Sequence, residues 1–185
     1  FERTLFYHPE TAPPFFQKND FPLQKVPLDK ENLKPSLLAS GSIPLLMSGI
    51  TDIQGAAKGV YRDGGIIDYH MDIPFLNSED ESIVLYPHFT DRIIPGWLDK
   101  KLTWRKPQPS NMENVLLVAP SKSFIASLPF HKIPDRTDFW TFNRKDEERI
   151  AYWKTVISRS ELLGNEFIDT VESDRIKDLV QPMAC

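Results

Sequence analysis

Lys58-Gly59-Val60-Tyr61-Arg62-Asp63-Gly64-Gly65 is the most informative stretch of this sequence. Residues 58–61 favour a short extended run, and an aspartate with two glycines follows directly. Because glycine has no Cβ, another group can approach the carboxylate of Asp63 closely, and backbone angles that other residues avoid become accessible. An aspartate that takes a proton directly from a nucleophile needs such access. Asp-Gly is also a common turn signal, so a plain hairpin or strand-exit turn is the alternative interpretation.

A second motif lies about twenty residues upstream. Leu37-Leu38-Ala39-Ser40-Gly41-Ser42-Ile43-Pro44 reads as a short helix that runs through small residues into a proline, and Pro35 suits the first turn of that helix. An apolar run at 45–47, a polar loop at 52–55 and the extended run before Asp63 follow. The sequence therefore predicts the order helix, loop, strand, Asp-Gly-Gly.

Residues 36–75, with these two motifs in this order, resemble the C-terminal half of the patatin-like phospholipase catalytic domain. In that family an Ala-Ser-x-Ala-x-Pro block precedes the Asp-Gly-Gly or Asp-Gly-Ala that supplies the second member of a Ser–Asp dyad. The resemblance implies that Asp63 is the catalytic base and that Gly64 and Gly65 form the turn supporting it. Ser40 and Ser42 become structural positions of the block that shapes the cleft. Asp68 departs from the family, where many members carry asparagine or another neutral residue.

The other half of the family's signature is missing from these residues. The nucleophile motif Gly-x-Ser-x-Gly does not occur, and the nearest candidates, Gly41-Ser42-Ile43 and Ser48-Gly49-Ile50, lack the flanking glycines. A Gly-rich oxyanion loop is also missing, and both motifs lie N-terminal to the aspartate in the family. We therefore expect residues 1–185 to be the C-terminal part of one α/β domain, a three-layer α/β/α hydrolase with Pro-rich loops and C-terminal helices.

The resemblance implies a carboxylic ester hydrolase of the phospholipase A or esterase type, acting on a lipid or ester substrate in lipid degradation. The N-terminal half of the same protein would be the partner that carries the serine, and this chain alone is expected to be inactive. No metal or organic cofactor is implied. The alternative from another class is a catalytically inactive lipid- or partner-binding module of the same architecture.

Asp68-Tyr69-His70-Met71-Asp72 places two carboxylates and an imidazole at every second residue. In an extended segment all three would point to one face, as metal ligands on a strand do. The alternative is a solvated strand face or a rim loop, with Tyr69 and Met71 packed inward. Their proximity to Asp63 makes His70 and Asp68 candidates for the rim of the catalytic cleft. The remaining histidines each adjoin an aromatic residue or a proline and are expected to be packing or surface residues: His8, His88 and His131.

Composition limits the function classes. The chain has 185 residues, of which 41% are hydrophobic and 26% charged, as in an ordinary globular domain. A net charge of −4 provides no basic field, so nucleic acid is not an expected partner. The single cysteine, Cys185, excludes an internal disulfide framework. No run approaches the ~18 apolar residues of a membrane span. The sequence leaves the compartment open between the cytoplasm and a peripheral membrane location.

An aromatic and basic stretch follows the motif region. Trp97 and Trp104 lie among Arg92, Lys100, Lys101, Arg105 and Lys106. This mixture is typical of a segment that contacts a membrane surface, where aromatic rings lie at the interface and cations face anionic headgroups. A partly buried loop with a solvated charged edge is the alternative.

The remaining elements follow from local patterns. The first 28 residues are rich in proline and aromatic residues and are expected to be an irregular or edge segment. Residues 82–86 and 115–119 are short apolar runs and predict two buried strands. Residues 145–163 predict a helix that Gly164 ends, and 166–180 predict one more helix. Strands alternating with helices indicate an α/β layer structure.

Overall fold

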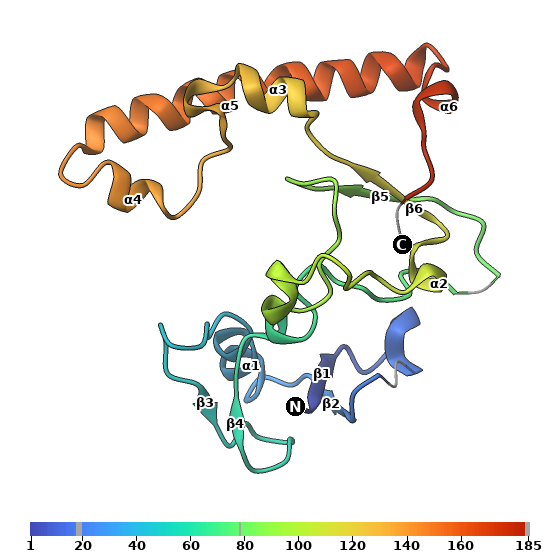
Figure 1. Cartoon of the computed structure of the whole chain (residues 1–185). Coiled ribbons are helices and arrows are strands. Elements are labelled where there is room, and N and C mark those ends of the chain that lie inside the picture. Colours follow the sequence, from blue (N-terminus) through green and yellow to red (C-terminus); the bar gives the residue numbers. More distant parts are fainter. Residues whose placement is uncertain (18–19, 78, 184–185) are drawn as a thin grey trace. The chain divides into compact units, whose positions relative to one another are not determined.

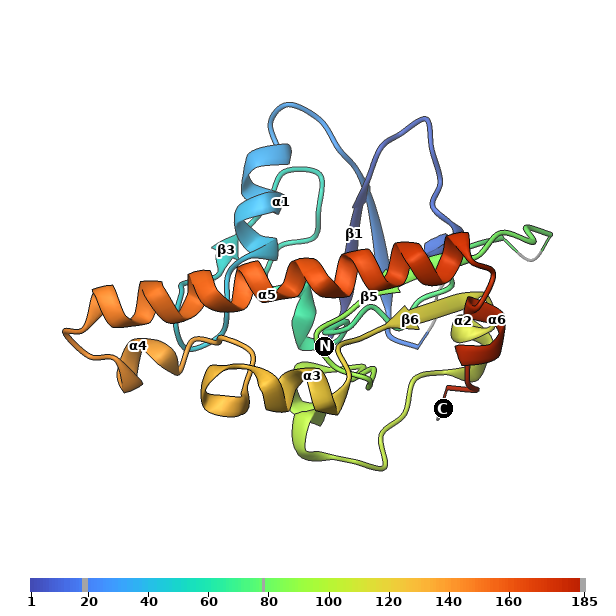
Figure 2. The same cartoon turned by 90° about the horizontal axis from the view of Figure 1, so that it is seen from above.

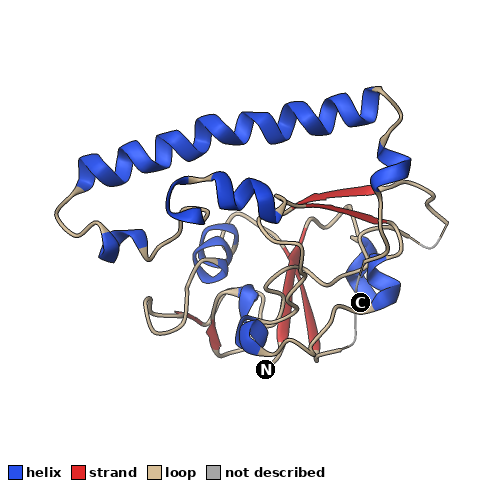
Figure 3. Ribbon diagram, turned by 45° about the horizontal axis from the view of Figure 1, so that its top comes forward, coloured by secondary structure: helices blue, strands red, loops and turns tan. Residues whose placement is uncertain are grey.

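The computed structural model describes residues 1–17, 20–77 and 79–183 (Figure 1). Helices and short strands alternate along the chain in the following order: β1 (Arg3–Tyr7), η1 (Pro14–Gln17), β2 (Leu23–Pro27), α1 (Leu33–Ser40), β3 (Ile50–Thr51), β4 (Val60–Tyr61), η2 (Gly64–Ile66), β5 (Val84–Pro87), η3 (Trp97–Lys101), α2 (Pro109–Met112), β6 (Val115–Val118), α3 (Lys122–Ser127), η4 (Pro129–His131), α4 (Asp138–Thr141), α5 (Asp146–Glu172) and α6 (Ile176–Leu179). The η elements are 3₁₀ helices. The chain is therefore a mixed α/β protein, as expected, but with little sheet: in the described residues each sheet has two strands (Figure 3).

The described chain divides into two compact units. The first, unit 1, contains residues 1–85 and 92–116, and the second, unit 2, contains residues 86–91 and 117–183. Strands β5 and β6 pair with each other, and both pass from unit 1 into unit 2 along their length. Val84 N–H donates to the carbonyl of Asn114 and His88 N–H to that of Val118, each at 2.8 Å.

Unit 1 begins with a parallel strand pair that the sequence did not predict (Figure 2). β1 and β2 run from Arg3 opposite Leu23 to Tyr7 opposite Pro27. Of the two expectations for this segment, the irregular one is wrong for residues 3–7 and 23–27, whereas the edge interpretation fits, since both strands of a two-stranded sheet are edge strands. Residues 8–22 form the crossover, which is long enough for a parallel connection. The prolines do not interrupt the pairing, because Pro27 stands at its last position, where the missing N–H matters least.

Asn32 holds the end of β2 against the start of α1. Its side chain is fully buried, accepts from the N–H of Asp29 at 2.9 Å and donates to the carbonyl of Pro27 at 3.0 Å. Asp29 Oδ1 in turn accepts from Asn32 N–H at 2.7 Å. Helix α1 follows, with Pro35 in its first turn as predicted. A buried amide with both ends satisfied fixes where this helix begins.

Unit 2 is built around α5, which extends from Asp146 to Glu172. Three acidic residues in its first turn complement the positive end of the helix dipole. Its inner face packs into a cluster of four buried residues: Leu128, Phe142, Tyr152 and Val156. The predicted helix is confirmed, but the predicted stop at Gly164 is wrong. A Cβ at Gly164 would meet no atom within 4 Å, and α5 continues past Gly164 to Glu172, with Thr170 still buried.

Two further expectations need correction. The separate helix at 166–180 is absent from the described residues as such, because 166–172 belong to α5 and only Ile176–Leu179 form α6. The strands β5 and β6 lie close to their predicted positions, but neither is buried: β5 alternates between half-buried and exposed residues, and β6 is half-buried throughout. A two-stranded sheet leaves much of each strand open to solvent, whatever its composition.

Candidate functional site

Asp63 lies in the turn that leaves the β3–β4 hairpin. Ile50 pairs with Tyr61 and Thr51 with Val60, and Asp63 follows two residues after β4. Its Oδ1 accepts a hydrogen bond of 2.8 Å from the N–H of Gly65, so the carboxylate caps the short helix η2. Oδ2 accepts no hydrogen bond from the described residues, and the side chain is half-buried. One oxygen is thus held in place while the other is available as a proton acceptor.

The structure brings the two motifs of the sequence into contact. The backbone N–H of Asp63 donates to the carbonyl of Ser42 at 3.2 Å. Ser42 is itself 1% exposed, and its hydroxyl donates to the carbonyl of Leu38 at 2.7 Å. This hydroxyl is therefore used within the end of α1, consistent with the structural role expected for Ser42. Ser40 is the last residue of α1 and is exposed. Among the described residues, no serine hydroxyl donates to the carboxylate of Asp63.

Gly64 and Gly65 differ in how much space surrounds them. Neither glycine has a positive φ, so the turn does not need the special backbone angles that the sequence analysis allowed for. A Cβ at Gly64 would meet nothing within 4 Å, whereas one at Gly65 would lie 3.0 Å from Asp63 Oδ1 and 3.7 Å from Tyr69 Cδ2. The missing side chain at Gly65 is what lets the carboxylate fold back onto its own turn. The open space at Gly64 leaves room for a group from elsewhere.

Asp68 forms an ion pair with the N-terminal strand. Its two oxygens accept from Arg3 Nε at 2.7 Å and Arg3 Nη2 at 2.8 Å, and Arg3 also contacts Asp20 at 2.6 Å. Burial lowers the pKa of the Arg3 guanidinium, but the hydrogen bonds and charges of the two carboxylates outweigh it and raise that pKa above its ordinary value. Asp68 therefore connects the turn after Asp63 to β1.

His70 is buried, at 5% exposure, rather than placed at an open rim. Its Nδ1 accepts from the N–H of Ile94 at 3.0 Å, and its ring stacks on that of Tyr69 with centroids 4.4 Å apart. The prediction that His70 and Asp68 lie at the rim of a catalytic cleft, completed by another part of the protein, stays a prediction.

The extended, single-faced arrangement of Asp68, His70 and Asp72 is wrong. Met71 has a φ of 47°, which interrupts any strand, and residues 68–72 form none. Asp72 accepts from Gln108 N–H at 2.9 Å and Asn111 Nδ2 at 2.8 Å, whereas Asp68 and His70 contact other segments. The described residues bring no three metal-ligating side chains together. The metal-site alternative therefore has no geometric support here.

A segment that sequence reasoning did not connect with Asp63 covers this turn. Tyr69 N–H donates to the carbonyl of Pro95 at 2.8 Å, and the ammonium of Lys100 lies 4.1 Å from the centroid of the Tyr69 ring. A Cβ at Gly96 would lie 3.3 Å from the carbonyl oxygen of Ile66, so any other residue would push the two backbones apart by a few tenths of an ångström. The Pro95-Gly96 dipeptide in the sequence indicates a turn at this point, but it does not indicate which other segment the backbone approaches.

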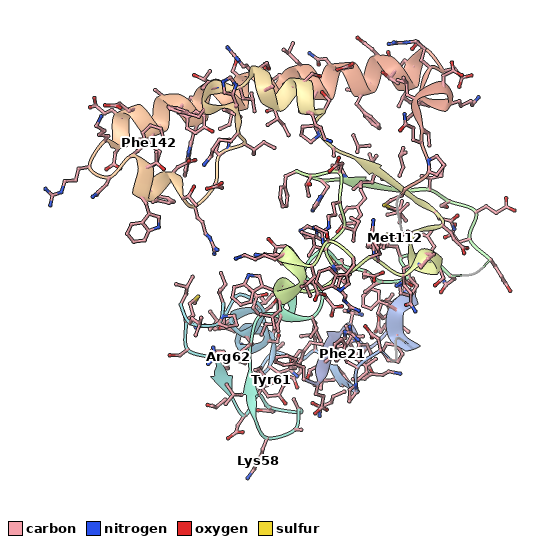
Figure 4. All side chains as sticks on the ribbon, viewed as in Figure 1. Phe21, Lys58, Tyr61, Arg62, Met112 and Phe142 are labelled. Carbon is pink, nitrogen blue, oxygen red and sulfur yellow. The ribbon has the colours of Figure 1, made fainter. Side chains whose placement is uncertain are left out.

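Apolar side chains are exposed along α1 and the loop that follows it. On α1, Leu33, Leu37 and Leu38 are 46%, 66% and 49% exposed. In the loop, Leu45 reaches 95% and Leu46 72%. Figure 4 shows Arg62 beside this region, at the end of β4, while Lys58 lies at the far tip of the hairpin. Several large apolar side chains exposed on one helix and the loop that follows it are typical of a contact with another surface.

The other histidines are engaged with nearby backbone. His8 Nδ1 accepts from Glu10 N–H at 3.3 Å, His88 Nδ1 lies 2.8 Å from the carbonyl oxygen of Thr90, and His131 Nδ1 contacts that of Ala126. These local contacts agree with packing or surface roles.

No protein-family model matches the chain, and no curated protein or solved structure does either. The described helices include none with the length and apolar content needed to cross a bilayer.

Proposed function

We propose that this chain supplies the general base, Asp63, of a Ser–Asp dyad in a patatin-like lipid acyl hydrolase of three-layer α/β/α architecture. The observation that supports the proposal is the carboxylate of Asp63. Its Oδ1 is held by Gly65 N–H, and its backbone is hydrogen-bonded to Ser42 of the Ala-Ser-x-Ser-Ile-Pro block. A base must be held in a defined position to remove a proton, and the hydrogen bond from Gly65 N–H holds one oxygen of the Asp63 carboxylate.

The serine in this mechanism comes from the part of the protein that precedes the chain. Its hydroxyl proton passes to Asp63 as its oxygen bonds to the acyl carbonyl carbon. The tetrahedral intermediate then collapses, and the alcohol leaves with the proton from Asp63. Water next gives a proton to Asp63 and attacks the acyl-enzyme, which releases the fatty acid and returns the proton to serine. Backbone N–H groups of a Gly-rich loop, also N-terminal, stabilise the oxyanion.

The exposed leucines of α1 support the proposal that an N-terminal part of the protein packs on this helix. Leucine side chains that are about half exposed on a helix are the usual sign that another part of a protein packs on it. The same face would serve the alternative function, a binding module without catalysis. The coding sequence upstream of Phe1 separates the two, because only the enzyme requires Gly-x-Ser-x-Gly there.

The kinetic test is Asp63→Asn in the longer protein. General-base assistance is typically worth ~10²–10⁴ in rate, so ester hydrolysis should fall by that factor while the fold and lipid-surface binding stay unchanged. Asp52→Asn is the matched control: Asp52 is exposed in the same hairpin, has a φ of 51° that asparagine tolerates, and accepts from Gly59 N–H through an oxygen that asparagine keeps.

The histidines provide the opposing test. His70→Ala, His88→Ala and His131→Ala should each retain most activity per folded molecule, because a dyad needs no imidazole. If one of them were as damaging as Asp63→Asn in folded protein, a triad would replace the dyad.

A further inference from the structure

Two exposed segments of unit 1 are fastened to the turn that carries Asp63. The first, the apolar loop, is residues 43–47. It exposes four apolar side chains, with Ile43 at 37%, Leu45 at 95%, Leu46 at 72% and Met47 at 51%. Leu45 has a φ of 69°, an unfavourable angle for leucine that local hydrogen bonds maintain, among them Met47 N–H to Ile43 carbonyl at 3.0 Å.

Both ends of the apolar loop are bonded to the residues at the proposed catalytic turn. Asp63 N–H holds the carbonyl of Ser42 at one end, and Arg62 Nη1 donates to the carbonyl of Met47 at 3.0 Å at the other. The guanidinium of Arg62 therefore lies at the base of a protruding apolar tip. An apolar tip with a cation at its base is how peripheral proteins contact an anionic lipid surface.

The second segment, the basic aromatic segment, is residues 92–106. It carries five basic residues against a single acidic one, Asp99, in a chain whose net charge is −4. Leu98 and Trp104 are 65% and 72% exposed within it. Its contacts with the turn are Pro95 to Tyr69 and Lys100 to the Tyr69 ring, described above. Positive charge and exposed apolar side chains thus accompany the turn on this segment as well.

We propose that the apolar loop and the basic aromatic segment form a contact surface for an anionic lipid aggregate beside Asp63. The inference rests on the proposed function and names its substrate surface. Apolar residues of the loop enter the acyl region while the cations meet the headgroups, so that lipid is presented next to the base. The excess of basic residues in the basic aromatic segment favours a lipid over a protein partner. A protein that packs on an apolar loop needs no cations nearby, whereas a layer of anionic headgroups does.

Sedimentation with vesicles tests the proposal on the 185-residue chain. We expect binding to vesicles of phosphatidylcholine with phosphatidylglycerol, weaker binding to phosphatidylcholine alone, and release by high salt, which screens the headgroup charges. The pair Leu45→Ser and Leu46→Ser should weaken binding about a hundredfold and Trp104→Ala about tenfold, since the pair removes the apolar burial of two side chains and Trp104→Ala that of one. Ile157→Ser is the control, an equally exposed residue at 66% on α5 of unit 2.

Three results would overturn the proposal: equal binding to neutral and anionic vesicles, equal loss with Ile157→Ser, or binding by this chain that the longer protein lacks. The last result would mean that preceding chain covers the apolar loop. Failure here is distinguishable from failure of the dyad, because sedimentation needs no catalysis. Asp63→Asn should bind vesicles like the unmodified protein whatever happens to hydrolysis.

Discussion

Unit 2 has one contiguous buried cluster, whereas the buried apolar residues of unit 1 come from separate segments of the chain. In unit 2 the cluster of Leu128, Phe142, Tyr152 and Val156 is contiguous, and Phe124, Ile133 and Trp153 pack against it. In unit 1 the buried apolar residues come from separate segments, such as Val26, Ala39 and Ile93, while α1 and the apolar loop expose leucines. Both units also expose large apolar side chains, for example Leu45 in unit 1 and Trp140 in unit 2, so the units differ in how their buried residues are joined.

A core truncation should separate the two regions most clearly. Leu128 is 1% exposed, and Leu128→Ala should lower the free energy of unfolding of unit 2 by about 2–5 kcal/mol, because it removes buried methyl groups and leaves a cavity. Denaturant unfolding followed by tryptophan fluorescence measures the loss. Leu162→Ala, at a residue 63% exposed on α5, should stay within about 0.5 kcal/mol. Similar losses for both would mean that unit 2 has no core of its own.

Asp138 is the polar counterpart of that core. It is 1% exposed and accepts from Lys132 Nζ at 2.7 Å, Trp153 Nε1 at 2.9 Å and Asp135 N–H at 3.0 Å. Burial raises the pKa of this carboxyl, but the hydrogen bonds from Lys132 and Trp153 outweigh it and lower the pKa overall. Its contribution to stability is therefore complete above the ordinary carboxyl pKa and is lost as the pH falls through the lowered value.

Asp138→Asn should cost roughly 2–3 kcal/mol at neutral pH, the usual effect of losing hydrogen bonds to a charged group. The free energy of unfolding measured between pH 7 and pH 2 should show a smaller acid-dependent loss for the variant than for the unmodified chain. Asp135→Asn is the control, with a carboxylate 53% exposed and a correspondingly weak ion pair. If the two substitutions lowered the free energy of unfolding equally, the buried hydrogen bonds of Asp138 would have no special role in the stability of unit 2.

Unit 1 depends instead on close backbone approaches, and Gly49 tests this. A Cβ at Gly49 would lie 2.4 Å from Val60 Cγ1 and 2.9 Å from the carbonyl oxygen of Tyr61. Gly49→Ala should therefore destabilise the hairpin before Asp63 by about 1–3 kcal/mol, the cost of overpacking. Gly59→Ala, where a Cβ meets nothing within 4 Å, is the matched control. Hydrogen exchange at Asp52, whose N–H bonds to the Gly59 carbonyl, gives the readout; faster exchange in both variants would contradict this explanation.

Local patterns predicted the elements whose formation is local. The acidic start and apolar spacing of 145–163 predicted α5, and local residues predicted the order of α1, a loop, β4 and Asp-Gly-Gly. The pairing of β4 with β3 was not predicted. The predicted helix end at Gly164 was wrong because a glycine does not by itself end a helix. α5 continues to Glu172, and Thr170 on the same helix is still buried.

The rest depends on partners distant in the sequence. β1 forms because Leu23–Pro27 lies beside it, and no local pattern names that partner. Asp68, His70 and Asp72 would share one face if the segment were extended, but each contacts a different residue, namely Arg3, Ile94 and Asn111. At the candidate site the sequence identified Asp63 and its glycines, while the covering segment around Pro95 and the unequal space at Gly64 and Gly65 required the structure.

The central claim is that this chain holds the base of an ester hydrolase and not its nucleophile. Hydrolysis of a short-chain p-nitrophenyl ester by the purified 185-residue chain and by the longer protein, measured side by side with and without a serine-directed inhibitor, tests it most directly. We predict no hydrolysis above buffer for the chain and inhibitor-sensitive turnover for the longer protein. Inhibitor-sensitive hydrolysis by the chain alone would contradict the assignment of Asp63 to a dyad completed from outside.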